Sequence, residues 1–231
     1  MTTPSTDTSV AALVTDRPAR ARVFEQLGID YCCGGDHSLA EACRTHDLDP
    51  DTVVRMLDLA AQSGAPDDTT DWSNVALAPL IDHIVDTHHA FLRRELPRLD
   101  ALLSRVVQAH GDDVTWLSPT LEVFRDLRAD LVAHMQSEEE RVFPSIRALA
   151  SGDADGIDRE ALNQMIGEHE EAGAALAQLQ DQTNGYTPPA DACPKFRAAM
   201  DGLEALERDM HRHVHKENNI LFPRARTQAS A

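Results

Sequence analysis

The sequence contains one frame twice, and this repeat restricts the fold more than any other feature. HMQSEEERVFP, residues 134–144, and HVHKENNILFP, residues 213–223, share the pattern H-x3-E-x4-F-P. An α-helix places residues three and four apart on one face, so each histidine lies on the same helical face as its glutamate. The two copies therefore predict two similar helices, each presenting an imidazole beside a carboxylate.

Both pairs continue an apolar helical stripe, which in a bundle faces the core. We therefore predict that these four polar side chains point inward. The first stripe is Phe124, Leu127, Leu131, His134, Glu138 and Val142, and the second is Phe196, Ala199, Leu203, Leu206, Met210, His213, Glu217 and Ile220.

Four long helical patterns occupy the C-terminal two thirds of the chain, at about residues 75–109, 119–150, 158–182 and 194–224. The remaining two patterns each bring one inward histidine: His83 follows Leu80, and His169 follows Met165 on its stripe. Short loops rich in Gly, Pro and Asp separate the patterns, and no strand pattern is visible. The predicted fold class is all-α, with an antiparallel four-helix bundle over residues 75–225.

A smaller helical domain is predicted ahead of the bundle, at residues 10–62. Residues 1–9 are rich in Thr and Ser, which predicts a disordered tail, and residues 63–74 have the composition of a linker. Within the domain, the first helix is expected to start near Pro18 and to stop at Gly28. Ser38 and Glu41 form a predicted capping box for the next helix.

The overall charge excludes several kinds of partner. The formal net charge is −18, from 39 acidic and 21 basic residues, and such a surface repels nucleic acid and anionic membranes. The N-terminus has no signal-peptide pattern, and no apolar run is long enough to span a bilayer. We therefore expect a cytoplasmic protein whose four cysteines are reduced rather than paired in disulfides.

The inward polar residues predict a metal centre. Burying carboxylates without a partner costs several kcal/mol, so a cation is expected among them. A lone inward histidine, or one His-x3-Glu pair, would usually be structural, but two copies with histidines on both other helices favour metal. Imidazole and carboxylate ligands suit iron, zinc, copper or manganese, and iron fits redox or small-gas chemistry in a bundle core best. The six predicted ligands are His83, His134, Glu138, His169, His213 and Glu217.

Two further residues are candidates for supporting roles. Glu168 precedes His169 and is either a partner of a ligand or a surface residue. His89 is close to His83 in the chain, and its role is the least certain among the other histidines. Glu139 and Glu140 fall off the stripe and are expected in solvent.

The stretch DYCCGG, residues 30–35, places Cys32 beside Cys33 shortly before the capped helix. A helix N-terminus stabilises thiolate, and glycines let the backbone approach another group closely. One interpretation is a redox-active or iron-handling thiol pair; the other is two small residues packed in a tight turn. The residues themselves favour neither.

Together these motifs resemble the iron–sulfur cluster repair di-iron proteins of the RIC, or YtfE/ScdA, type. The resemblance covers about residues 10–225 and depends on DYCCGG, IDHI around His83, AHMQSEEERVFP, GEHEEAG and HKENNILFPRA. The Cys-Cys-Gly-Gly domain joined to a hemerythrin-like bundle is specific to that family.

The resemblance implies two non-haem irons joined by an oxo or hydroxo bridge, with the four histidines as terminal ligands and Glu138 and Glu217 as bridges. It implies repair of iron–sulfur clusters damaged by nitrosative or oxidative stress, through iron donation, reduction of nitric oxide, or both. Whether the chain is an enzyme of the nitric oxide reductase type stays open. Expected partners are apo or damaged iron–sulfur proteins and nitric oxide or oxygen, and a homodimer is left open.

Two other functions fit parts of the sequence. A hemerythrin-like protein that binds or senses oxygen or nitric oxide would need only the bundle. A protein–protein adaptor would use the metal for structure alone. Metal analysis would decide the adaptor alternative, and reversible oxygen binding with a stable spectrum, independent of Cys32 and Cys33, would favour the oxygen-binding one.

Overall fold

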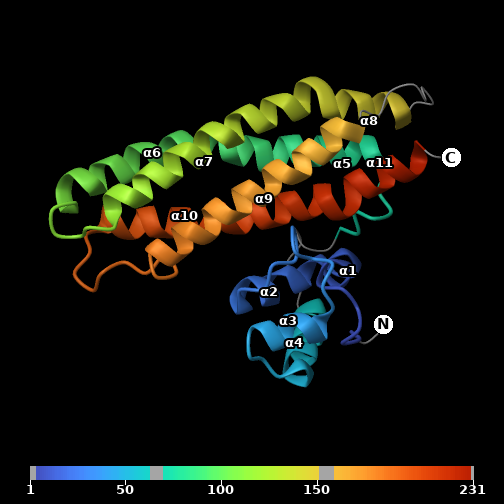
Figure 1. The fold of residues 1–231 in the computed structure, drawn as a ribbon, viewed down its shortest axis with the longest axis horizontal. Helices are drawn as coiled ribbons and strands as arrows, with labels where there is room; N and C mark the ends of the chain where they lie inside the picture. The colour runs from blue at the N-terminus through green and yellow to red at the C-terminus, as the bar shows by residue number, and fades with distance from the viewer. Residues whose placement is uncertain (1–3, 63–69, 151–158, 230–231) are drawn as a thin grey trace. The chain divides into compact units, whose positions relative to one another are not determined.

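The computed structural model describes residues 4–62, 70–150 and 159–229 (Figure 1). Across these residues the chain forms helices and one isolated β-bridge, between Ser9 and Ser38, and no β-strand, which confirms the all-α fold class. The chain divides into two compact units, Met1–Leu80 with His211–Ala231, and Ile81–Met210. Most of the predicted linker, and the predicted loop at 151–156, lie outside the described residues.

The first helix of the chain was not predicted. α1 spans Val10–Asp16, and the Ser9 side chain caps it by accepting from the Ala12 N–H. It ends because Arg17, which precedes a proline, is extended at φ −143°. The helix expected from Pro18 is a short 3-10 turn, η1 (Pro18–Arg20), followed by α2 (Ala21–Leu27).

The predicted helix signals in the rest of this segment are confirmed. Gly28 ends α2 with a left-handed φ of 67°. Ser38 and Glu41 form a capping box at the start of α3 (Leu39–Thr45). α4 (Pro50–Gln62) begins at Pro50, a residue type favoured in the first turn of a helix.

Residues 4–9, expected to be disordered, are instead tied to the rest of the unit. The backbone N–H of Leu39 donates to Thr8 O, and that of Ala40 donates to Thr6 O, both at 2.9 Å. These bonds use amide groups at the start of α3, where a helix leaves N–H groups without partners of its own. Composition could not reveal this tertiary pairing.

The N-terminal helices share an apolar core. Its members are buried side chains of all four α-helices and of the loop that carries the cysteine pair. They include Val10, Leu13, Phe24, Tyr31, Leu39, Cys43, Val53 and Leu57. In the same unit, η5 (Glu217–Leu221) contacts α1, and α11 (Phe222–Gln228) follows it with Phe222 and Ala225 fully buried.

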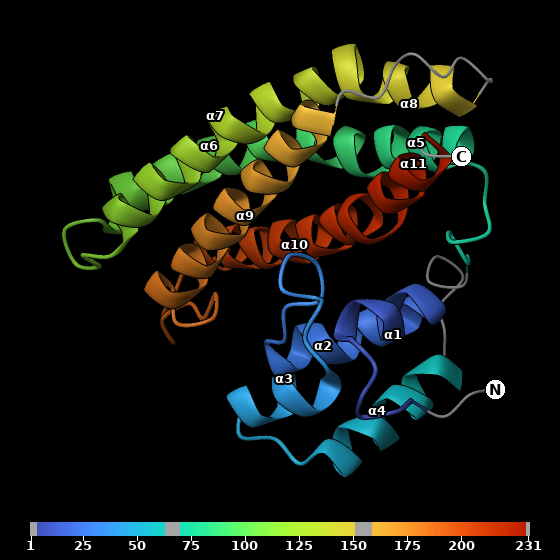
Figure 2. The same ribbon diagram turned by 45° about the vertical axis from the view of Figure 1, so that its right-hand side comes forward.

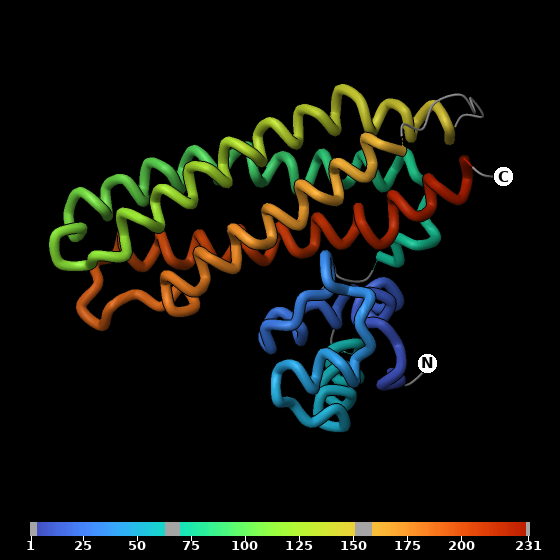
Figure 3. Tube along the Cα trace, in the orientation of Figure 1, coloured from blue at the N-terminus to red at the C-terminus, as the bar shows by residue number. Residues whose placement is uncertain are grey.

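The second unit is a bundle of long helices: α6 (Ala90–His110), α7 (Leu117–Ser137), α9 (Arg159–Gln182) and α10 (Pro194–Lys216). Of α10, only the residues up to Met210 belong to this unit. Figures 2 and 3 show these four helices side by side, with successive helices running in opposite directions. α7 contacts both α6 and α9. The bundle core is a continuous set of Leu, Phe and Met side chains.

Three of the long helical runs contain a π-helical segment. These are η3 (Ile84–His89) between α5 (Leu77–His83) and α6, η4 (Glu138–Val142) between α7 and α8 (Phe143–Ala150), and η5. A π segment is rare and is often found at functional sites. Each of these begins or ends at a histidine or glutamate that is buried.

In the described part of the chain, no helix combines the length and the apolar character needed to cross a lipid bilayer.

Candidate metal centre

Glu138 is the central residue of the candidate site. It opens η4 and its side chain is fully buried. Its Oε2 lies 3.2 Å from His89 Nε2, and its Oε1 lies 3.4 Å from His134 Nε2. The two carboxylate oxygens therefore face two different imidazoles, one from η3 and one from α7.

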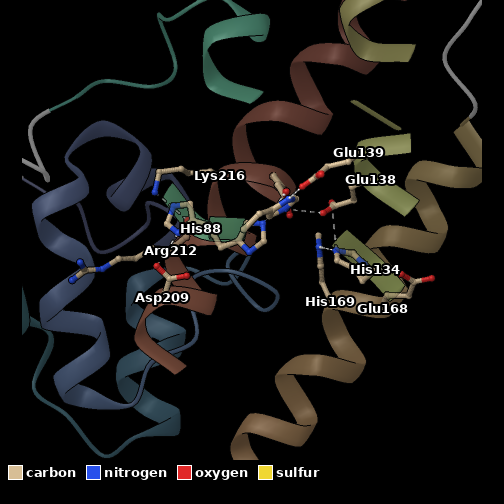
Figure 4. A network of polar contacts seen from close by, with 12 residues as sticks. His88, His134, Glu138, Glu139, Glu168, His169, Asp209, Arg212 and Lys216 are labelled. Atoms are coloured by element: carbon tan, nitrogen blue, oxygen red, sulfur yellow. Dashed lines mark hydrogen bonds and ion pairs between the residues drawn. The ribbon is translucent and has the colours of Figure 1, made fainter. Parts of the chain in front are cut away.

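His134 and His169 meet beside this carboxylate. Their Nε2 atoms are 3.0 Å apart, and both side chains are buried. The ligand atoms of His134, Glu138 and His169 all lie within 4.8 Å of one another. Figure 4 shows these three side chains pointing toward one another from the facing helices.

The outward nitrogens of two of these histidines are held by carboxylates. His134 Nδ1 lies 2.7 Å from Glu168 Oε2, and His89 Nδ1 lies 2.6 Å from Glu139 Oε1. A carboxylate accepts, so each Nδ1 donates, and in the neutral ring the lone pair of Nε2 then faces Glu138. This carboxylate–histidine arrangement is the usual support of a metal-binding histidine.

The role suggested for Glu168 thus matches its position, whereas Glu139 was expected in solvent. Glu139 is only partly exposed and also accepts a hydrogen bond from Arg93, with Nη2 2.7 Å from Oε2. Burial raises the pKa of Glu139, but the hydrogen bonds from Arg93 and His89 outweigh it, and the net pKa is lowered. Its partner lies on another helix, which the periodicity of its own helix could not indicate.

For the first long helical run, the histidine found at the candidate site differs from the predicted ligand, His83. The structure brings His89 to Glu138, while His83 is partly exposed and lies beside Thr87, with Nδ1 3.2 Å from Oγ1. The stripe was continued at 3.6 residues per turn, but residues 84–89 form a π-helix with more residues per turn. His83 lies in α5, before this segment, and is already off the buried face formed by Leu80, Ile81 and Ile84, whereas His88 and His89, both within the π segment, are buried.

His213 and Glu217 form a second buried pair. His213 Nε2 lies 3.1 Å from Glu217 Oε1, and the two side chains are 1% and 0% exposed. Glu217 opens η5, as Glu138 opens η4. The repeated sequence frame therefore produces the same local structure twice, with the histidine in an α-helix and the glutamate at the start of a π segment.

The bundle contains another buried histidine, His88, which the sequence left between a surface position and a supporting role near the ligands. His88 is 3% exposed, and its Nδ1 lies 2.9 Å from Asp209 Oδ1 (Figure 4). The aspartate lies on α10, so again the partner comes from a different helix.

A groove of about 390 Å³ runs between α7 and α9. His134, Glu168 and His169 lie along it. The groove therefore gives this side of the histidine cluster a route to solvent.

The cysteine loop is organised around one carboxylate. Asp30 Oδ1 accepts from the N–H groups of Cys32 and Cys33 at 2.8 and 3.0 Å, and Oδ2 accepts from Gly34 N–H at 2.7 Å. Desolvation raises the pKa of Asp30, but these amide donors and the Cys32 thiol outweigh it and lower the pKa. A side chain at Gly35 would place its Cβ 2.6 Å from Tyr31 O, so the loop requires glycine there.

The two cysteines have different environments. Cys32 is buried, with Sγ 3.2 Å from Asp30 Oδ1 and 3.7 Å from Cys33 Sγ. The hydrogen bond with Cys33, burial and the charge of Asp30 raise its pKa well above the ordinary value. The raised pKa favours the neutral thiol at Cys32 over the thiolate that a helix N-terminus would stabilise. Cys33 is more exposed.

Comparison with known proteins extends these observations. Residues 80–225 match the family model described as the hemerythrin HHE cation binding domain, and residues 6–61 match ScdA_N, described as a domain of unknown function (DUF542). The chain is 34% identical over 219 residues to "Iron-sulfur cluster repair protein YtfE" of Enterobacter sp. (strain 638), covering 95% of this chain and 96% of the relative. Proteins of the same name from Salmonella paratyphi B and Salmonella newport are 34% identical over 222 residues, with the same coverage.

Proposed function

Because this chain belongs to the family of hemerythrin-like iron–sulfur cluster repair proteins, we propose that it repairs iron–sulfur clusters damaged by nitrosative or oxidative stress. The proposed centre is a pair of non-haem irons in the bundle. Iron serves either as the cargo delivered to an apo-cluster or as the site where nitric oxide is reduced. The partners are apo or damaged iron–sulfur proteins of the cytoplasm.

We propose His89, His134, His169 and His213 as the terminal ligands, with Glu138 and Glu217 as bridges. One observation carries the assignment: the two oxygens of fully buried Glu138 face His89 and His134, 3.2 and 3.4 Å away. A carboxylate that joins two metal ions directs its two oxygens in this way. We include His213 and Glu217 in the ligand set because both are buried and repeat the H-x3-E pattern of His134 and Glu138.

The chemistry of this donor set fits iron. Neutral imidazole and carboxylate are suitable ligands for iron, and a carboxylate excluded from water requires a nearby cation. When bound, two irons would supply electrons and open coordination positions for a diatomic gas. The protein residues orient the ligands: Glu168 and Glu139 hold the Nδ1 protons of His134 and His89, and the apolar bundle core limits the entry of water.

We also propose that Cys33 is the thiol that meets partners or reagents first. It is the more exposed of the pair, whereas Cys32 is buried and hydrogen-bonded to Asp30. Handling of iron or electrons by the pair would therefore begin at Cys33.

Reconstitution with a damaged client tests the repair function. The protein is loaded with iron, its iron content is measured, and it is mixed with a dehydratase whose cluster has been destroyed by nitric oxide. Recovery of dehydratase activity, or consumption of nitric oxide under reducing conditions, is expected. The Cys33→Ser variant tests the thiol, and Cys43→Ser, which changes a buried core cysteine, serves as its control.

Two outcomes would contradict the proposal. A chain that binds two irons but restores no client and consumes no gas is not a repair protein. A stable oxygen adduct that forms reversibly and does not depend on Cys33 would instead favour an oxygen carrier.

A further inference from the structure

Two side chains near the C-terminus hydrogen-bond consecutive carbonyls of the cysteine loop. His215 Nδ1 lies 3.2 Å from Tyr31 O, and Asn219 Nδ2 donates to Cys32 O at 3.0 Å. All of these residues belong to one compact unit, Met1–Leu80 with His211–Ala231. The loop that carries the thiols is therefore attached to the helical run that carries His213 and Glu217.

The carbonyl contact favours one tautomer of the His215 ring, whose Nδ1 also lies 3.3 Å from Asn219 Nδ2. A carbonyl oxygen can only accept, so Nδ1 carries the proton and donates to Tyr31 O. Nε2 then accepts, and Thr15 Oγ1 lies 3.3 Å from it as the donor. The ring is 4% exposed and is fixed between α1 and the loop. An imidazole with both nitrogens engaged in this way has one orientation.

His215 and Asn219 occupy the opposite face of the helix from the candidate ligands. Each lies two residues after one of them, His213 and Glu217. In the α-helix that carries His213 and His215, two residues correspond to about 200° of rotation, and the step from Glu217 to Asn219 in the wider π segment η5 is somewhat smaller but still reaches the far side. One face of this turn therefore presents the imidazole and carboxylate of the proposed centre, and the reverse face holds the cysteine loop.

A third set of hydrogen bonds, made by Arg212 one turn before His215, holds the same loop. The buried Tyr31 donates its hydroxyl to Glu25 Oε1 at 3.0 Å, and Arg212 Nε donates to the same oxygen at 2.9 Å. The Tyr31 ring also lies edge-on to the His215 ring, with centroids 5.4 Å apart. The loop is thus fixed by side chains from two successive turns of the helix.

We infer that His215 and Asn219 are positioning residues for the cysteine pair. They hold the Cys32 peptide so that the Cys32 thiol stays buried against Asp30, on the reverse face of the turn that carries His213 and Glu217. The use of the thiols in repair rests on the proposed function, but the positioning itself does not. Any displacement of the loop reaches the ligand-bearing turn through these two hydrogen bonds.

The test measures how fast a maleimide labels Cys32 in iron-loaded protein. Labelling is followed residue by residue by peptide mass spectrometry in a Cys33→Ser background, so that the more exposed thiol does not react first. Asn219→Ala and His215→Gln remove the two contacts, and we expect each to accelerate labelling of Cys32 about tenfold, the effect of one lost hydrogen bond on local opening. His215→Asn, whose amide nitrogen lies near the position of Nδ1, should stay close to the parent rate.

Two controls separate positioning from general loosening. His46→Gln changes an exposed histidine of the same unit and should leave the rate unchanged. Cys43, fully buried in the apolar core of that unit, is the internal reference. The inference is supported if Asn219→Ala and His215→Gln accelerate the labelling of Cys32 alone, and if His215→Asn keeps the parent rate.

Equal labelling rates of Cys32 in Asn219→Ala, His215→Gln and the parent would overturn the positioning role of His215 and Asn219. So would parallel acceleration at Cys43, or a His215→Asn variant as fast as His215→Gln. Iron content is measured in the same samples. A chain without iron would contradict the proposed centre, while the labelling comparison would still decide the role of His215 and Asn219.

Discussion

His89 and Glu138 face each other across two helices, with Nε2 3.2 Å from Oε2 and both side chains fully buried. The histidine ends one π segment and the glutamate begins another. Their meeting distinguishes the proposed centre from the one that the sequence stripe predicts, because His83 lies elsewhere on its helix.

Replacing His89 and His83 separately by alanine tests which of the two histidines is a ligand. His89→Ala should lower the iron content to about half of the parent value or less, since it removes one ligand and leaves Glu138 facing an empty position. His83→Ala is the matched control, six residues away, and should retain iron. Metal analysis after reconstitution gives the answer; loss of iron in His83→Ala alone would restore the original prediction.

The fully buried Glu138 should lower the stability of the metal-free protein. Glu138→Gln keeps the shape and removes the charge, so at pH 8, where an ordinary imidazole is neutral, we expect the free energy of unfolding without metal to rise by about 1–3 kcal/mol. Iron binding should be lost in the same variant. Urea denaturation of the metal-free proteins measures the first effect. A less stable Glu138→Gln protein would show that the carboxylate is already well compensated without metal.

Glu168 should tune the metal affinity through His134. Glu168→Gln replaces the charged acceptor at 2.7 Å from His134 Nδ1 with a weaker one, and we expect iron affinity to fall about 10–100-fold. Glu170→Gln changes an exposed glutamate two residues along α9 and should have little effect. Competition with a chelator measures the affinities. The same loss in both variants would point to a general effect of surface charge.

Cys193 should react at lower pH than an ordinary thiol. The backbone N–H of Phe196 and the ring of His110, whose Nε2 lies 3.3 Å from Sγ, lower its pKa. A lowered pKa gives more thiolate at a given pH, so its iodoacetamide rate should begin to rise below the pH expected for a free cysteine.

His110→Ala removes one of these donors and should move the rate profile of Cys193 to higher pH. The rate at Cys193 is followed by mass spectrometry as a function of pH. An unchanged midpoint in His110→Ala would show that the helix amides alone determine the pKa.

Much of this protein follows from local sequence rules. The helical periodicity, the capping box at Ser38, the helix stop at Gly28 and the repeated H-x3-E frame all act within a few residues of chain. They predicted an all-α fold and the inward direction of His134, Glu138, His169, His213 and Glu217, each of which is buried.

Contacts between segments distant in sequence decided the rest. His89, at the end of the π segment at 84–89, contacts Glu138 from another helix, a pairing that the stripe of its own helix does not specify. Glu139 became a partner of His89, and residues 4–9 became ordered against α3, through atoms about 30 or more positions away. The hydrogen bonds of His215 and Asn219 to the cysteine loop join residues 184 and 187 positions apart. Local propensity carries no information about such pairs, since their free energy arises only when the tertiary fold brings the two segments together.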